Sequence, residues 1–222
     1  MYAIMAVIDE KRRRMVAQVA ARGVSDERVL AALGSVRRER FVAAHLADRA
    51  YDDGPLDIGL GQTISQPYIV AVMAEAAGIE PGDQVLEVGT GSGYGAAVLA
   101  ALGAEVWTIE RLAPLADEAR RHLEAEGVAV NGPGGVHVIV GDGSVGFHPE
   151  GAGLAPWDAI VVTAAAPEVP RALVAQLADG GTLVLPVGKP GGVQALVRIR
   201  RQGERFEPED LGPVRFVPLV SD

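Results

Sequence analysis

Three carboxylates follow three apolar runs in the second half of this 222-residue chain, at the points where buried strands are expected to end. Glu87 closes QVLE, Glu110 closes EVWTIE, and Asp142 follows VHVIVG. The carboxyl ends of parallel strands meet at one edge of a sheet, and open α/β folds bind their ligands there. Glu110 or Asp142 alone could be an ordinary capping or turn residue. Three acids at three successive strand ends favour a shared ligand site.

A glycine-rich turn, EVGTGSGYGA, begins with the first of these acids. Gly89, Gly91 and Gly93 would let the backbone approach a ligand, and the helix that follows would offer free N–H groups. The letters GSGYGA match the dinucleotide fingerprint, which alone is a weak signal. A carboxylate at Glu87 would oppose a pyrophosphate, and it suits a cationic or hydroxyl-bearing ligand instead.

The two later acids fit the same ligand site. A carboxylate at Glu110 can accept hydrogen bonds from both hydroxyls of a ribose, whether the ligand is NAD or S-adenosyl-L-methionine. Asp142, in VGDG, could reach an adenine amino group. The pattern acid-x-Gly-x-Gly-x-Gly resembles that of methyltransferases that use S-adenosyl-L-methionine, a ligand with an amino group, a sulfonium and no phosphate.

A second polar stretch, GLGQTISQP over residues 59–67, lies upstream between two helical segments. It contains the hydroxyls of Thr63 and Ser65 and little that could enter a core, so it predicts either a flexible linker or a lid over a small-molecule site. Ser65 would also suit the N-cap of a helix that begins near Pro67 or Tyr68. A capping hydroxyl next to a site could do both.

The elements that must position these residues are helices first and alternating strands and helices afterwards. Apolar spacing and breakers predict helices over residues 9–21, 25–33 with Ser25 as N-cap, 41–46 and 68–77. Strands are then expected over 84–89, 105–110, 136–142, 157–165 and 182–188, with helices over 93–103, 112–127 and 169–177 between them. Two further strands, over 193–201 and 212–220, are joined by a short polar stretch, which predicts an antiparallel pair at the end of the sheet.

This alternation predicts a single doubly wound α/β domain with a mostly parallel sheet. Residues 1–80 would form a helical N-terminal extension and lid, and residues 81–222 the ligand-binding core.

Composition narrows the class of protein. The net charge of −9 and the presence of only two lysines argue against a nucleic-acid partner. With no cysteine there are no disulfides or thiolate metal sites, and no apolar run is long enough to span a bilayer. His45, His122, His137 and His148 show no metal-ligand spacing, so no metal is expected. We expect a cytoplasmic, monomeric protein.

The chain closely resembles the protein-L-isoaspartate O-methyltransferase family over nearly its whole length. The most specific segments are RERFV, GQTISQPYIVA, VLEVGTGSGYGAAVLA, GDG, DAIVVTAAAPEVP and LVLPVG. The resemblance implies a Rossmann-like methyltransferase fold that uses S-adenosyl-L-methionine to methylate L-isoaspartyl residues in damaged proteins and peptides. It favours a lid rather than a linker for residues 59–67, and Ser65 matches the serine usually assigned as active. One departure is Gly95, where many bacterial relatives have glutamine.

The resemblance also implies the cofactor contacts. They are Gln62, Thr63, Ile64, Ser65, Glu87, Gly89, Gly91, Gly93, Glu110, Asp142, Gly143 and Thr163. Thr163, after the fourth strand, could equally be a plain strand residue.

The implied reaction needs no strong general base, because the substrate carboxylate is already ionised at neutral pH. The enzyme would align the reactants and exclude water, with Ser65 orienting the isoaspartyl carboxylate and main-chain N–H groups near 63–65 and 214–216 holding the substrate backbone. The methyl ester would then close to a succinimide unaided, and hydrolysis would return some aspartate.

Three alternatives stay open at this point. A related O-methyltransferase that modifies a dedicated peptide during natural-product maturation would have the same cofactor site. The interpretation as a NAD-binding oxidoreductase rests only on the loose match of GSGYGA to the dinucleotide fingerprint. A non-catalytic binding protein could keep the cofactor fold.

Overall fold

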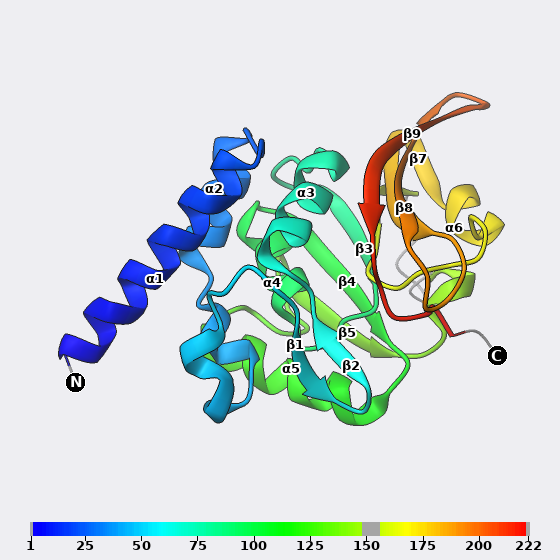
Figure 1. Cartoon of the computed structure of the whole chain (residues 1–222). Coiled ribbons are helices and arrows are strands. Elements are labelled where there is room, and N and C mark those ends of the chain that lie inside the picture. The colour runs from blue at the N-terminus through cyan, green and yellow to red at the C-terminus, as the bar shows by residue number, and fades with distance from the viewer. Residues whose placement is uncertain (1, 148–155, 221–222) are drawn as a thin grey trace.

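The central feature of the protein is a seven-stranded sheet of order β5-β4-β3-β6-β7-β8-β9, seen in a computed structural model that describes residues 2–147 and 156–220 (Figure 1). Its strands are β3 Gln84–Val88, β4 Glu105–Glu110, β5 Val136–Val140, β6 Trp157–Val162, β7 Leu177–Val187, β8 Gln194–Gln202 and β9 Arg205–Val214. Strands β3 to β7 pair in parallel, whereas β8 pairs antiparallel with both β7 and β9. The expected mostly parallel α/β sheet with an antiparallel C-terminal pair is confirmed.

The strand order reverses next to β3. The chain runs outward from β3 to β4 and β5 and then returns to place β6 on the other side of β3. The connections that follow β3 and β6 therefore leave the sheet in opposite directions, which opens a crevice at the carboxyl ends of these two strands.

Helices cover both faces of the sheet. One face packs against α3 Pro67–Ala77, α4 Tyr94–Ala101 and α5 Ala113–Glu126, and the other against the short α6 Arg171–Ala175. Alternate residues of the central strands enter the two cores, so that Val85 and Leu86 point to opposite sides.

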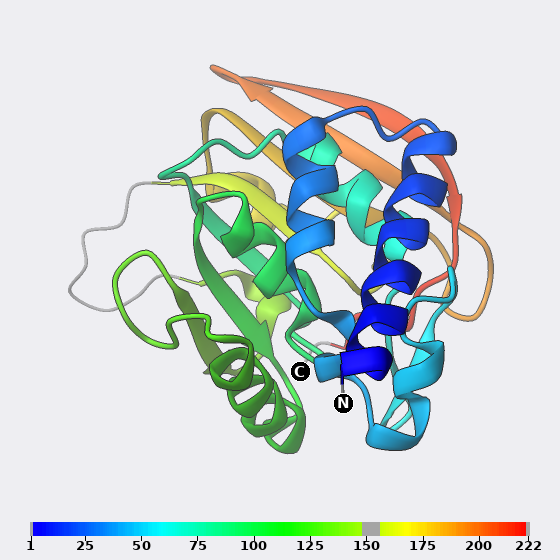
Figure 2. The same cartoon turned by 90° about the vertical axis from the view of Figure 1, so that its left-hand side faces the viewer.

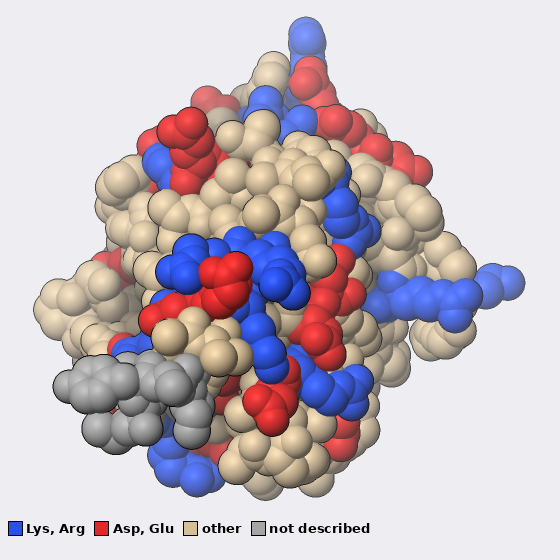
Figure 3. Space-filling view, turned by 60° about the vertical axis from the view of Figure 1, so that its left-hand side comes forward, with Lys and Arg blue, Asp and Glu red and all other residues tan. Residues whose placement is uncertain are grey.

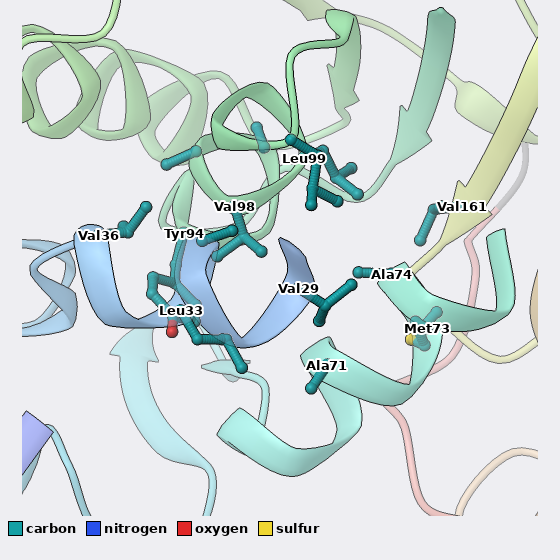
Figure 4. Packing of buried hydrophobic residues seen from close by; sticks show 14 of the residues in the cluster. Val29, Leu33, Val36, Ala71, Met73, Ala74, Tyr94, Val98, Leu99 and Val161 are labelled. Carbon is teal, nitrogen blue, oxygen red and sulfur yellow. The ribbon is translucent and has the colours of Figure 1, made fainter. Parts of the chain in front are cut away.

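The N-terminal helices α1 Tyr2–Ala21 and α2 Glu27–Ser35 lie side by side along one flank of the domain (Figure 2). Val29 and Leu33 of α2 are buried in the same core as residues of α3 and α4 (Figure 4). The expected helical extension is thus confirmed, and it shares one continuous apolar cluster with the sheet. Among the described residues, no helix is long and apolar enough to cross a membrane.

Several predicted boundaries in the first half were wrong. The N-cap of α2 is Asp26, whose side chain accepts from the Arg28 N–H at 2.8 Å, while Ser25 donates its N–H to Glu75 at 2.7 Å. The helix expected over 41–46 is replaced by two 3-10 turns, η1 Arg38–Phe41 and η2 Ala44–Arg49.

Two boundaries near the C-terminus were also wrong. The last strand, β9, begins at Arg205 and ends at Val214, because the turn after Gln202 leads directly into pairing with β8. Most of β9 is exposed and polar, so it lacks the apolar alternation that would have revealed it. The helix expected over 169–177 stops at Ala175, because Leu177 already pairs with Trp157 of β6.

Candidate functional site

A cavity of about 310 Å³ lies at the carboxyl ends of β3, β4 and β6, where the strand order reverses. We call it the first cavity. Most of the predicted cofactor contacts meet here, although they come from five separate segments of the chain. Those that line it are Gln62, Thr63, Ile64, Ser65, Glu87, Gly89, Gly91, Glu110, Gly143 and Thr163.

The glycine turn forms one wall because two of its residues need a backbone that side chains disfavour. Gly89 has φ +97° and Gly91 has φ +52°, both in the left-handed region. A Cβ on Gly89 would also overlap the hydroxyl of Thr163, which donates to the Gly89 carbonyl at 2.6 Å. Thr163 therefore lines the cavity and ties the turn to the end of β6.

Glu110 holds the turn from the other side. Its Oε2 accepts from the Gly91 N–H and its Oε1 from the Leu112 N–H, both at 2.9 Å. A carboxylate offers about four acceptor positions, so roughly two remain for a ligand in the cavity. This geometry suits a vicinal pair of hydroxyls, as the sequence predicted.

Glu87 is the most buried acid of the site, with 1% of its surface exposed. It accepts from the hydroxyl of Thr108 at 2.6 Å, and that hydroxyl lies 2.7 Å from the hydroxyl of Thr90. Burial raises the pKa of Glu87 to about 8, and the nearby charge of Glu110 adds to this, although the Thr108 hydrogen bond acts in the opposite direction. A cation in the first cavity would favour the ionised form.

Gly93 and Asp142 were also predicted contacts, but neither lines the first cavity. A Cβ on Gly93 would lie 3.3 Å from side-chain atoms of Ala119 and Leu123, so this glycine lets α4 pack closely on α5. The Asp142 carboxylate caps the short turn η3 Gly143–Val145, accepting from the Ser144 N–H at 2.8 Å. In this structure Asp142 has the role of a turn residue beside the site.

The polar stretch 59–67 is part of a small hairpin rather than a plain loop. Strands β1 Leu56–Gly59 and β2 Gln62–Ile64 pair antiparallel, and the chain then enters α3 with Gln66 at the N-cap. The N-cap expected at Ser65 was therefore wrong. The Ser65 hydroxyl makes no hydrogen bond with any residue that the structure describes, and Ser65 lines the first cavity.

A second cavity of about 490 Å³ adjoins the first. Thr63, Ser65, Thr163 and Val217 line both, so they form the boundary between the two spaces. Sequence reasoning missed that residues 217–220 line the first cavity. Their backbone is fixed by hydrogen bonds between Ala165 and residues 217 and 219, at 2.7 and 2.8 Å.

No group of three or more His, Asp or Glu residues within 2–147 and 156–220 is arranged to hold a metal ion. His122 bonds the Ser92 carbonyl at 3.0 Å and His137 pairs with Glu105 at 2.9 Å, both outside the cavities. His148 lies outside the described residues.

Comparisons with known proteins agree with one another. The family described as protein-L-isoaspartate(D-aspartate) O-methyltransferase matches residues 10–222. The protein-L-isoaspartate O-methyltransferase of Methylorubrum populi is 56% identical over 214 residues, which cover 96% of this chain and 96% of that protein. That of Methanoculleus marisnigri is 52% identical over 96% of this chain and 92% of its own.

Solved structures share the fold. A protein-L-isoaspartate O-methyltransferase superposes with a TM-score of 0.82 at 28% identity, over 95% of this chain and 66% of that chain. A Plasmodium falciparum protein of the same description, solved with S-adenosyl-L-homocysteine, gives a TM-score of 0.78 at 24% identity, over 95% and 99% of the two chains.

Proposed function

The chain belongs to the protein-L-isoaspartate O-methyltransferase family, and on that premise we propose that it is a protein repair enzyme. It transfers a methyl group from S-adenosyl-L-methionine to the carboxylate of L-isoaspartyl residues in damaged proteins and peptides. The observation that carries this proposal is the placement of Ser65, which lines both of the two adjoining cavities. A two-substrate transfer needs such a boundary, with the donor on one side and the acceptor on the other.

The first cavity suits S-adenosyl-L-methionine in the charge of its lining and in the hydrogen-bond acceptors that it offers. Glu110 sets negative charge beside the space that a cationic ligand would occupy, and such a ligand would also favour the ionised form of the buried Glu87. Glu110 keeps acceptor positions for ribose hydroxyls, and the backbone at Gly89 and Gly91 leaves no side chain in the way. We assign cofactor binding to the predicted residues that line the first cavity, with Gly93 and Asp142 supporting them from outside it. When bound, this cofactor supplies a methyl group on a positively charged sulfur.

The second cavity takes the isoaspartyl substrate. Its carboxylate is ionised at neutral pH and is the nucleophile, so the protein has to orient it rather than deprotonate it. Ser65 donates a hydrogen bond to one carboxylate oxygen and leaves the other free to react. Thr63 lies on the same boundary, where Thr163 holds the Gly89 carbonyl and so fixes the glycine turn beside the reacting group.

Residues 1–80 act in this scheme as the helical extension and lid, and residues 81–222 as the cofactor-binding core. Closing the hairpin β1–β2 over the cavity excludes water from the reacting groups. We further propose that the protein works as a monomer, since both cavities are built from one chain, and that it acts in the cytoplasm.

The test is mass spectrometry of an isoaspartyl peptide and its aspartyl twin, each incubated with the protein and S-adenosyl-L-methionine. Methyl ester or succinimide on the isoaspartyl peptide alone is the expected result. Cofactor binding measured by calorimetry, with neither peptide modified, would contradict general repair and leave a dedicated peptide substrate as the function to pursue. Modification of both peptides equally would contradict isoaspartyl selectivity.

A further inference from the structure

The two adjoining cavities differ in the charge of their walls. The first cavity is lined by two acidic side chains, Glu87 and Glu110, and one cation, Arg111. Within the described part of the chain, the second is lined by the cations Arg22 and Arg215 and by no acidic side chain. A basic lining is unexpected in a protein with a net charge of −9, in which both signs are interspersed over other parts of the surface (Figure 3).

Arg22 is held in place and is largely compensated. Its guanidinium is ion-paired with Asp53 and lies over the ring of Tyr68, with Cζ 3.5 Å from the ring centroid. Asp53 also accepts from the side chain of Gln66 at 2.9 Å, so the pair belongs to a network at the start of α3. Arg22 thus contributes a fixed cation whose charge is shared with Asp53.

Arg215 is anchored differently, because its backbone is fixed while its side chain has no partner in the part of the chain that the structure describes. Val214 pairs with Gln194 of β8, and the Phe216 N–H donates to the side chain of Gln194 at 2.9 Å. Val214 and Phe216, on either side of Arg215, are therefore both held by the buried Gln194. The Arg215 side chain is exposed and makes no hydrogen bond or ion pair with any described residue.

We propose that Arg215, supported by Arg22, makes the second cavity select isoaspartyl substrates that carry an acidic side chain next to the isoaspartyl residue. This deepens the proposed function and rests on it. Arg215 lines only the second cavity, whereas the isoaspartyl carboxylate must reach the boundary at Ser65. A full ion pair to the attacking carboxylate would also weaken it as a nucleophile, so a flanking anion is the better partner for this guanidinium.

The effect is modest because the guanidinium is exposed. Solvent-exposed ion pairs change an equilibrium by a factor of about two to five. A preference of this size between an acidic and a neutral neighbour is expected at low salt, and it should shrink as ionic strength rises.

The experiment uses three isoaspartyl peptides that differ at one flanking position, which is Glu, Gln or Lys. The ratio of kcat/KM between the Glu and Lys peptides is measured for the unsubstituted protein, Arg215→Gln and Arg215→Glu, with thermal unfolding as a check on folding. Arg200→Glu is the matched control, because Arg200 is an exposed residue of the same hairpin and lines neither cavity.

The unsubstituted protein and Arg200→Glu should favour the Glu peptide by about two- to fivefold, Arg215→Gln should abolish the preference, and Arg215→Glu should reverse it. A ratio that is the same in all four proteins would overturn the proposal. An equal loss of kcat/KM on all three peptides in the Arg215 variants would also overturn the proposal, because Arg215 would then act on the part that the peptides share. Failure of the unsubstituted protein to methylate any of the peptides would overturn the proposed function itself, and this inference with it.

Discussion

The Glu87 carboxylate occupies the space into which a side chain at position 95 would project, so Glu87 and Gly95 are fitted to each other. A Cβ built on Gly95 would overlap Oε1 of Glu87, while the other oxygen of that carboxylate is held by the Thr108 hydroxyl at 2.6 Å. Both residues line the first cavity. The glycine at position 95 is therefore part of how this chain positions its buried acid.

Gly95→Ala should weaken cofactor binding. The added methyl group must push the Glu87 carboxylate off the Thr108 hydroxyl or toward the cavity, and overpacking of this kind costs about 1–3 kcal/mol. We expect the dissociation constant for S-adenosyl-L-homocysteine, measured by calorimetry, to rise by about fivefold to a hundredfold. Gly132→Ala is the control, since nothing lies within 4 Å of a Cβ there. Equal affinities in the two variants would mean that Glu87 does not depend on Gly95.

Glu110→Ala should also weaken the affinity for S-adenosyl-L-homocysteine, for a different reason. The substitution removes the acceptor of the Gly91 N–H and the carboxylate that faces the cavity. A hydrogen bond to a charged group contributes about 1.5–3 kcal/mol, so a loss of about tenfold to a hundredfold is expected. Glu118→Ala, at a partly exposed position of α5 that lines neither cavity, should leave the affinity unchanged. If Glu110→Ala did so as well, Glu110 would have to be removed from the site.

Much of this site could be predicted because its residues interrupt regular patterns. Apolar runs located the strands, and acids and glycines at their ends predicted where a ligand would bind. Thr108 was missed because threonine is an ordinary strand residue, and only the pairing of β3 with β4 shows that Thr108 stands opposite Glu87. This register could have been predicted, because Glu87 and Thr108 are each the fourth residue of their strand.

Other features could not be read from local sequence. The boundary formed by Ser65, Thr163 and Val217 joins segments about 50 to 100 residues apart, and it depends on the tertiary packing of three loops. Asp142 was assigned to the ligand because it follows a strand, but a capping acid at the end of a strand has the same local pattern. The hairpin β1–β2 was overlooked because its strands are three and four residues long.

The raised pKa of Glu87 predicts a pH-dependent stability. Because its folded-state pKa of about 8 lies above the usual 4.5, the folded protein binds the proton more tightly than the unfolded chain. Its contribution to stability is therefore complete below pH 4.5 and is lost as the pH rises through about 8. The side chain in Glu87→Gln stays neutral at every pH. The melting temperature of this variant, relative to that of the unsubstituted protein, should therefore rise by a few degrees between about pH 6 and pH 9.

Thermal unfolding of both proteins without cofactor, at closely spaced pH values, measures this difference directly. Carboxyls whose pKa is lowered, such as Glu105 beside His137, change charge below pH 4.5 and do not contribute in this range. A constant difference in melting temperature from pH 6 to pH 9 would show that Glu87 has the same charge throughout, which would contradict its assignment as a buried acid with a raised pKa.

Ser65→Ala should separate catalysis from cofactor binding. Ser65 lines both cavities and its hydroxyl has no hydrogen-bond partner among the described residues, so its removal should not disturb the lid or the cap of α3. Loss of one hydrogen bond to a charged substrate group lowers kcat/KM by about tenfold to a hundredfold. The affinity for S-adenosyl-L-homocysteine should stay within about twofold, as it should in the remote control Ser35→Ala, whose hydroxyl bonds the Ala32 carbonyl at 2.9 Å. A parallel collapse of methylation and cofactor affinity in Ser65→Ala would make Ser65 a structural part of the first cavity, because a residue that only orients the acceptor leaves the donor site intact.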